Sequence, residues 1–318
     1  MRSIFEAADP DCAFVNAHAA AVHMALEAAT GFRAARRYLT RARGRAKSAT
    51  AREQAFVAAI YKWWRGDTRA ALKDLRQLVT AYPADIVAAK WAQYLAFNIG
   101  DAGAMCAVAE AVMPAHRTTA EARGMLAFGF EQTDRFEEAE DAARHALSLK
   151  AAEPWAHHAI AHVMDTQGRI DEGIAFLTHH APAWRDRGIF VREHNYWHLA
   201  LMHLDRDEHA AALAIFDDRL WGEWPEFAQE QIGAISALWR LELRGESACA
   251  PLGAAPACRR QSRSTRRLRA DMDRRGSARG AAFGGGRCRR HTRPRPSGRE
   301  RDSTLAHPRP RGGMRWCP

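Results

Sequence analysis

The chain has 318 residues, 47% of them hydrophobic, and a formal net charge of +10 at pH 7. Frequent Ala and sparse β-branched residues exclude a large sheet and indicate an all-α protein. The positive charge lies in residues 248–318, which carry a net charge of +15, whereas residues 1–247 hold 28 basic and 33 acidic residues, a net charge of −5. Because the body is mildly acidic, its net charge does not indicate a polyanionic partner.

The first predicted helices form a weak hairpin whose two segments are VNAHAAAVHMALEAATGF and RAARRYLTRARGRA. The segment that follows, ATAREQAFVAAIYKWW, has Thr50 and an early Glu53, a pair suited to starting a helix. We therefore expect a further helix to begin directly after Thr50.

A repeat becomes visible in the turns that follow. Turn-forming residues at Gly66, Gly100, Asp134 and Gly168 each precede a helix start, and they lie 34 residues apart. A fifth turn falls at Asp207, 39 residues after Gly168, so we place about five extra residues in the loop WRDRGIFVREHN. This period is typical of the tetratricopeptide repeat, two antiparallel helices joined by a tight turn.

The period predicts the fold class and the domain organisation. We expect residues 1–247 to form a right-handed α-solenoid of tetratricopeptide-type hairpins, with about eleven or twelve helices. Small residues such as Ala161 and Ala200 let the paired helices approach closely. The segment QEQIGAISALWRLELRG is predicted to be the first helix of a sixth unit, with no partner helix visible after it.

Residues 248–318 have a different composition, with 19 Arg, no Lys and no apolar period. Such a segment cannot bury a core, so we expect it to be disordered. It has three interpretations: a basic arm for nucleic acid, a solvated tail, or a frameshifted and non-native sequence. We favour the last, because many Arg, Gly, Pro and Cys without Lys are typical of a GC-rich gene translated out of frame.

Cysteine usage and hydropathy indicate a cytoplasmic protein. Only Cys12 and Cys106 precede residue 248, and neither has a C-x-x-C partner, so neither a disulfide framework nor a zinc knuckle is expected. The amino terminus has acids and a proline where a signal peptide needs an apolar run, and no stretch reaches transmembrane length. We expect no membrane partner.

Histidines are concentrated in two adjacent units, EPWAHHAIAHVMDTQGR and VREHNYWHLALMHLD. His158 and His162 are four residues apart, as are His194 and His198. On a helix this spacing puts two imidazoles on one face, about one turn apart, where both can bind one metal ion. A divalent transition metal is therefore a candidate cofactor, with these four histidines as its ligands.

The repeat register predicts which residues face the concave groove. In each unit, the second, fifth, ninth and twelfth places of the first helix face inward. In one unit these places are Trp155, His158, His162 and Asp165. The unit after it offers His194 and Trp197, with His198 one step off the inward face. The preceding unit offers Glu131. The predicted ligand-binding residues are Glu131, Trp155, His158, His162, Asp165, His194 and Trp197.

Three interpretations of this group stay open. The aromatic rings and histidines fill space between helices, or they bind a ligand or peptide, or they form a metal or acid/base site. The sequence has no H-E-x-x-H, Walker loop, G-x-S-x-G or dinucleotide fingerprint, so no catalytic residue is assigned.

Three segments carry a resemblance to a known family: GMLAFGFEQTDRFEEAEDAARHALSL, WAHHAIAHVMDTQGRIDEGIAFL and HNYWHLALMHLDRDEHAAALAIFDDRLW. In order and spacing they resemble the tetratricopeptide repeat protein 38 family, also called StaR-like, over roughly residues 5–247. The resemblance implies an α-helical repeat protein and carries over no catalytic residues. Family members extend on both sides of the matching region, which implies that this sequence is a fragment.

These observations give three functional hypotheses. The favoured one is a scaffold that binds a peptide, a partner protein or a small ligand in its concave groove. The alternative is a metal-dependent or acid/base enzyme that uses the clustered histidines. The third is nucleic-acid binding through the Arg-rich segment, but we do not expect a nucleic-acid partner.

Overall fold

The computed structural model describes residues 9–184, 188–224 and 227–245, all within one compact unit, Met1–Ala250. The predicted tail, residues 248–318, lies outside the described residues, so its disorder and its non-native origin stay predictions. Within the described part, no helix is both long and apolar enough to cross a membrane.

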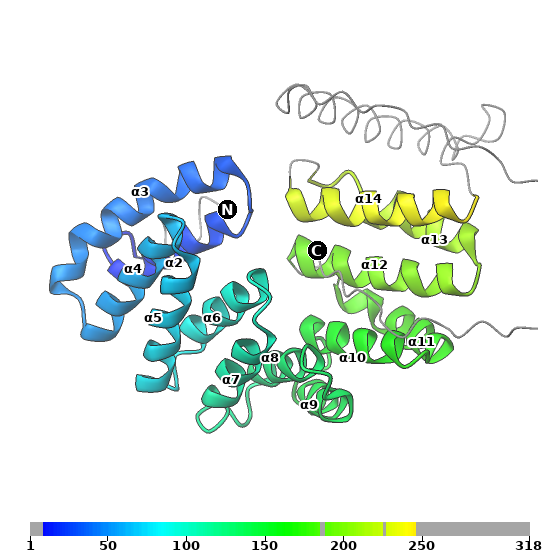
Figure 1. Ribbon diagram of the computed structural model, residues 1–318, viewed down its shortest axis with the longest axis horizontal. Coiled ribbons are helices and arrows are strands. Elements are labelled where there is room, and N and C mark those ends of the chain that lie inside the picture. Colours follow the sequence, from blue (N-terminus) through cyan, green and yellow to red (C-terminus); the bar gives the residue numbers. More distant parts are fainter. Residues whose placement is uncertain (1–8, 185–187, 225–226, 246–318) are drawn as a thin grey trace, which may run out of the picture. The chain divides into compact units, whose positions relative to one another are not determined.

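The described residues form thirteen α-helices and three short helical segments, and contain no strand (Figure 1). This confirms the all-α prediction. The α-helices are α2 (Ala13–Met24), α3 (Ala29–Arg45), α4 (Ala51–Trp64), α5 (Thr68–Ala81), α6 (Ile86–Asn98), α7 (Ala102–Val112), α8 (Ala120–Glu131), α9 (Phe136–Leu149), α10 (Pro154–Thr166), α11 (Ile170–His180), α12 (Ile189–Asp205), α13 (His209–Ile215) and α14 (Ala228–Leu243). The short segments are η1 (Ala46–Ser48), η2 (Ala181–Trp184) and the π-helical η3 (Phe216–Leu220).

Consecutive helices pair into hairpins, and each hairpin packs on the next to give an α-solenoid of tetratricopeptide type. The second helices α5, α7, α9 and α11 begin at 34-residue intervals, as the period predicts. The five predicted turn residues all have φ between 57° and 88°, the left-handed region that Gly adopts without strain and Asp tolerates. They are Gly66, Gly100, Asp134, Gly168 and Asp207.

Side-chain caps explain where several helices begin. Thr50 and Glu53 form a capping box at the start of α4, which confirms the predicted helix start. Asp67, Asp85 and Asp101 each accept a hydrogen bond from the backbone N–H three residues later, at the starts of α5, α6 and α7. These bonds satisfy amide groups that have no partner inside the helix.

The position of the extra residues in the fifth interval differs from the prediction. Four of the five extend α12, which starts at Ile189 and has 17 residues where α10 has 13, and one lies before it. The segment IFVREHNYWHLALMHLD contains no Gly or Pro to stop a helix, so the insertion is accommodated as one additional turn.

Close packing of small residues forms the core between helices. Ala161 and Ala200 are 0% and 1% exposed. Gly129 of α8 allows a close approach, since a Cβ there would lie 2.9 Å from the Cα of Cys106 on α7. Any side chain at that position would force the two helices apart.

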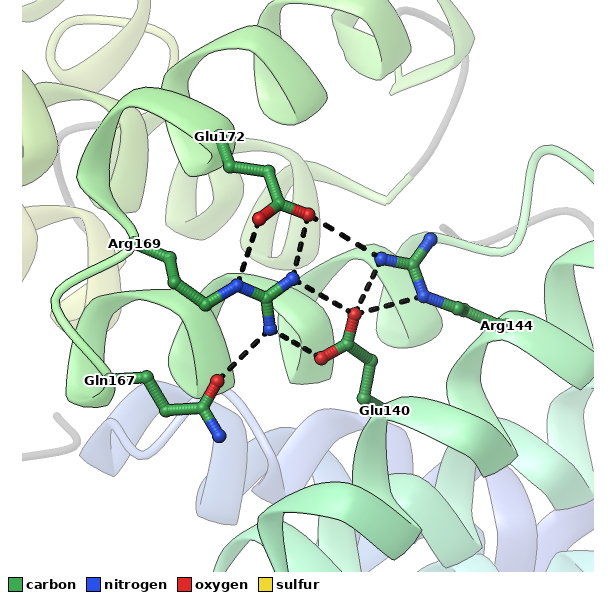
Figure 2. Close-up of polar contacts among 5 residues, drawn as sticks. All are labelled: Glu140, Arg144, Gln167, Arg169 and Glu172. Carbon is green, nitrogen blue, oxygen red and sulfur yellow. Dashed lines mark hydrogen bonds and ion pairs between the residues drawn. The ribbon is translucent and has the colours of Figure 1, made fainter.

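Ion pairs join the outer surfaces of adjacent hairpins. Figure 2 shows Arg169, at the turn before α11, bonded to Glu140 of α9 at 2.6 Å and to Glu172 at 2.6 Å. Arg144 completes the network through Glu140 at 2.5 Å and Glu172 at 3.7 Å. The four alternating charges tie the α8–α9 hairpin to the α10–α11 hairpin at partly exposed positions.

Candidate metal centre

Two adjacent first helices supply the four histidines of the candidate site. His158 and His162 are the fifth and ninth residues of α10, and His194 and His198 are the sixth and tenth of α12. Since α10 packs directly against α12, both pairs face the same space between the helices.

One ring nitrogen from each of the four histidines takes part in a group whose members all lie within 4.8 Å of one another. Within α10 the Nε2 atoms of His158 and His162 are 2.9 Å apart, and within α12 those of His194 and His198 are 3.2 Å apart. A zinc–nitrogen distance of about 2.0–2.1 Å places tetrahedral nitrogens roughly 3.4 Å apart. The four nitrogens therefore already lie close to the arrangement that one ion requires.

Aromatic rings enclose the four imidazoles. Phe128 of α8 meets His158 edge-on at 5.2 Å, and Trp155 meets the same ring at 5.6 Å. On the other helix, His194 stacks between Phe190 at 5.6 Å and Trp197 at 5.4 Å. This wall keeps three of the histidines buried, with exposed fractions of 1% to 8%, and leaves His162 as the half-buried member.

A carboxylate orients His162. Glu131 of α8 is 1% exposed, and its Oε1 lies 3.3 Å from His162 Nδ1. The other oxygen, Oε2, accepts a hydrogen bond from Gln132 at 2.6 Å. A carboxylate at Nδ1 favours the tautomer that leaves Nε2 free to donate its lone pair, an arrangement common behind metal-binding histidines.

The surroundings keep three of the imidazoles, those of His158, His194 and His198, neutral, which is the form that binds a metal. Burial, followed by the neighbouring histidines, holds the pKa of His158 and of His198 well below the ordinary value of 6.5. Burial also lowers the pKa of His194 to about 3. Moreover, His158 Nδ1 is buried without a hydrogen-bond partner, so the polar groups here are not fully satisfied by the protein itself.

The remaining predicted site residues lie beside this cluster with different exposures. Trp155 and Asp165 are half-buried, and Trp197 is buried against His194. Burial raises the pKa of Asp165, with Asp205 adding to the effect and His162 opposing it. The structure therefore groups Asp165 electrostatically with the histidines, whereas Trp197 packs within the wall.

The predicted register is wrong for α12. It put His198 one step off the inward face. In the structure, however, His198 contributes a ring nitrogen to the cluster just as His194 does. The register took His194 as the second place of this helix, but α12 already starts at Ile189, so the predicted inward places do not apply to it.

Two neighbours of the site were not predicted. Lys90 places its ammonium 4.1 Å from the centre of the Trp155 ring, and Phe190 contacts both Trp155 and His194. Burial lowers the pKa of Lys90 to about 8, against the opposing effect of Glu153. Lys90 is the fifth residue of α6, the position that His158 has in α10, so the repeat register contained the signal.

No family model matches the sequence. Among solved structures, the chain is similar to the thermophilic TPR protein TTC0263 of Thermus thermophilus, with 17% identity, a TM-score of 0.47, and coverage of 59% of this chain and 100% of that chain. It is also similar to MamA, with 18% identity, a TM-score of 0.39, and coverage of 59% and 96% respectively. For residues 41 to the end of MamA from Desulfovibrio magneticus RS-1, identity is 17%, the TM-score 0.33, and coverage 63% and 91%. The assignment of a tetratricopeptide-type fold rests on the paired helices and their 34-residue spacing in this structure.

Proposed function

We propose that this chain is a tetratricopeptide-type scaffold that binds one divalent transition metal ion between two adjacent hairpins. The observation that carries the proposal is the convergence of four imidazole nitrogens, from His158, His162, His194 and His198, within 4.8 Å of one another. Imidazole nitrogen suits Zn²⁺, Cu²⁺ and Ni²⁺ better than Ca²⁺ or Mg²⁺, which prefer oxygen.

The ligand count favours a structural role for the ion. Structural zinc sites are four-coordinate and closed, whereas catalytic sites use three protein ligands and leave one position for water or substrate. Four histidines inside an aromatic wall supply all four ligands. We therefore favour Zn²⁺ as a clamp between α10 and α12 over the alternative of a metal-dependent enzyme.

Charge balance supports a divalent ion in this site. Four neutral imidazoles leave the charge of the ion uncompensated, which is costly in a buried place. Glu131 is buried and in contact with His162, and Asp165 lies close enough for its pKa to respond to His162. Two carboxylates of this kind offset a double positive charge without occupying a coordination position.

Metal titration of the full-length chain tests the proposal. After treatment with a chelator, calorimetry should show one Zn²⁺ bound per chain. His162→Gln should weaken binding at least about 100-fold, because it removes a ligand. The matched control is His145→Gln, at an exposed position on α9, which should bind Zn²⁺ like the parent. Absence of stoichiometric binding, or equal binding by the two variants, would refute the metal site.

Cobalt spectroscopy tests the closed geometry separately. Four-coordinate Co²⁺ absorbs visible light much more strongly than six-coordinate Co²⁺, so the bound ion should give an intense visible band. A weak octahedral spectrum would instead indicate open positions filled by water and would favour the enzyme hypothesis.

A second candidate function is ligand or partner binding on the inner face beside the cluster. The observation that favours it is the half-buried pair of Lys90 and Trp155, which offers a cation and an indole next to the acidic Glu153. Peptide binding here, a cytoplasmic location and membership of the tetratricopeptide repeat protein 38 family remain proposals. Loss of partner capture by Lys90→Gln with unchanged Zn²⁺ binding is the expected result.

A further inference from the structure

Charge is unevenly distributed along the described unit, which the total for residues 1–247 conceals. Residues 29–76, which cover α3, α4 and most of α5, contain 13 Lys or Arg and 3 Asp or Glu, a net charge of +10. Residues 101–245 contain 13 basic and 24 acidic residues, a net charge of −11. The first two hairpins are therefore strongly basic, while the later ones are acidic.

Helix α3 concentrates this charge on one face. Its buried side is made of Gly31, Ala35, Tyr38, Leu39 and Ala42. All six of its arginines are exposed, and the helix contains no acidic residue. A helix of 17 residues is about 25 Å long, so the face carries roughly one positive charge every 4 Å. The exposed arginines are Arg33, Arg36, Arg37, Arg41, Arg43 and Arg45.

A groove beside α5, in the next hairpin, is also lined by cations. Arg69, Lys73 and Arg76 line it along successive turns of α5, and its volume is about 390 Å³. Asp101 is the acidic residue in its lining, and this carboxylate accepts a hydrogen bond from the N–H of Ala104 at the start of α7. The three cations make no ion pair within the described part of the chain.

The three acidic residues of this stretch do not neutralise the surface. Glu53 is engaged in the capping box of α4, and Asp67 caps α5. Asp74 pairs with Lys62 at 2.5 Å. At the end of α3, Arg45 pairs with Asp11, which precedes the stretch, at 2.5 Å. The stretch holds 13 cations and only three carboxylates. Most of the surface therefore has no counter-charge from its own helices.

The polarity and the Arg content of the surface favour a nucleic acid over an acidic protein as its partner. Protein interfaces depend on apolar and aromatic anchors in a buried centre, yet none of the exposed large hydrophobic side chains of the described residues lies between positions 29 and 76. Nucleic-acid interfaces, in contrast, are polar and rich in positive charge. Ten of the 13 cations are Arg, whose fork binds phosphate oxygens in pairs.

We propose that the outward face of α3 and the groove of α5 bind the phosphodiester backbone of a nucleic acid, without reading its sequence. This surface is formed by residues of the described unit, and none of its residues belongs to the Arg-rich stretch 248–318. It reverses our expectation that a nucleic-acid partner is absent, which rested on the net charge of the body and not on its distribution.

The test compares charge variants of the full-length chain, so that residues 248–318 contribute the same background to each. The α3 variant is Arg33→Gln with Arg36→Gln and Arg41→Gln. The α5 variant is Arg69→Gln with Lys73→Gln and Arg76→Gln. The control removes three exposed arginines from the acidic hairpins, by Arg117→Gln with Arg144→Gln and Arg206→Gln. Circular dichroism confirms that each variant is folded.

Binding is measured by fluorescence anisotropy, with a single-stranded RNA and a duplex DNA of two unrelated sequences each, from about 50 to about 200 mM salt. Each lost phosphate contact should reduce the magnitude of the slope of log affinity against log salt by about 0.7 to 0.9, hence by about 2 to 3 for a triple variant. We expect the α3 and α5 variants to lose at least about tenfold in affinity for every sequence, and the control much less.

Two results would overturn the proposal. If the α3 and α5 variants lose no more affinity than the control, the binding comes from overall charge or from residues 248–318. If polyglutamate of equal charge binds the parent as tightly as nucleic acid does, and the α3 and α5 variants lose both equally, the surface is a site for acidic protein segments. A difference between RNA and DNA identifies which backbone the surface prefers.

Discussion

Asp207 occupies a turn position at which three other repeats have glycine, and its φ is 57°. An L-residue other than Gly pays a conformational cost in this region, which is reduced but not removed for Asp. We expect Asp207→Gly to stabilise the protein by about 0.5 kcal/mol. The reciprocal change, Gly168→Ala, should destabilise it by about 1 kcal/mol, because a Cβ at Gly168 meets no atom within 4 Å and the backbone alone is tested. Urea melts measure both, and equal signs would contradict the argument.

Asp217 offers a residue-scale test of pH dependence. Burial raises the pKa of its carboxyl from 3.8 to about 6, and its Oδ1 is buried without a hydrogen-bond partner. The folded state holds the proton more tightly than the unfolded state. The free energy of unfolding therefore falls as pH rises through the window between these two pKa values, 3.8 and about 6. Asp217→Asn has no such loss. Its melting temperature should equal that of the parent near the low end of the window and exceed it at pH values above the window, by an amount equivalent to about 1 to 2 kcal/mol after screening by solvent. A constant difference across pH would contradict the assignment.

At the scale of the elements, close approach between paired helices sets the tolerance to substitution. Ala161 and Ala200 are almost fully buried, so Ala161→Leu or Ala200→Leu should cost about 1 to 3 kcal/mol through overpacking. Ala58 is an exposed residue of α4, and Ala58→Leu is the matched control, with an expected change near zero. Denaturant unfolding compares the three variants, and silent changes at both buried positions would show that the helices are less tightly packed.

The hairpins could be predicted because their turns require unusual backbone angles that few residues adopt. A 34-residue interval between Gly or Asp residues therefore located four turns, and Thr50 with Glu53 located a helix start. The extra turn of α12 could not be placed the same way, since the interval between turns counts residues without showing whether they join the loop or the helix. The same error displaced His198 from the predicted face.

The candidate site was only partly accessible from the sequence. Four-residue spacing identified both histidine pairs, because that spacing is a property of one helix. The contacts of Lys90 with Trp155 and of Glu131 with His162 cross between hairpins, so they depend on how adjacent repeats stack. The basic surface of α3 and α5 was hidden for a different reason: the acidic hairpins cancel its charge in any total taken over residues 1–247.

At the scale of the whole described unit, metal binding should stabilise one part of the repeat array more than the rest. In such arrays each hairpin contacts mainly its neighbours, so stabilisation at one interface is felt most strongly there. The four histidines lie at the interface of α10 with α12, and α12 also packs against α13 and α14. The ion would therefore connect the last three helices to the hairpins before them.

Hydrogen exchange of the full-length chain with and without Zn²⁺ measures this coupling. At a Zn²⁺ concentration about 100 times the dissociation constant, binding contributes about 2.7 kcal/mol to a folded state that alone binds the ion. Amide protection should rise by up to the corresponding factor in α10 and in α12 to α14, and much less in α4 to α7, where no ligand lies. His162→Gln should abolish the difference, while His145→Gln should retain it. Zinc-dependent protection spread evenly over α4 to α14 would mean that the unit unfolds as one cooperative body, and that the ion clamps no particular interface.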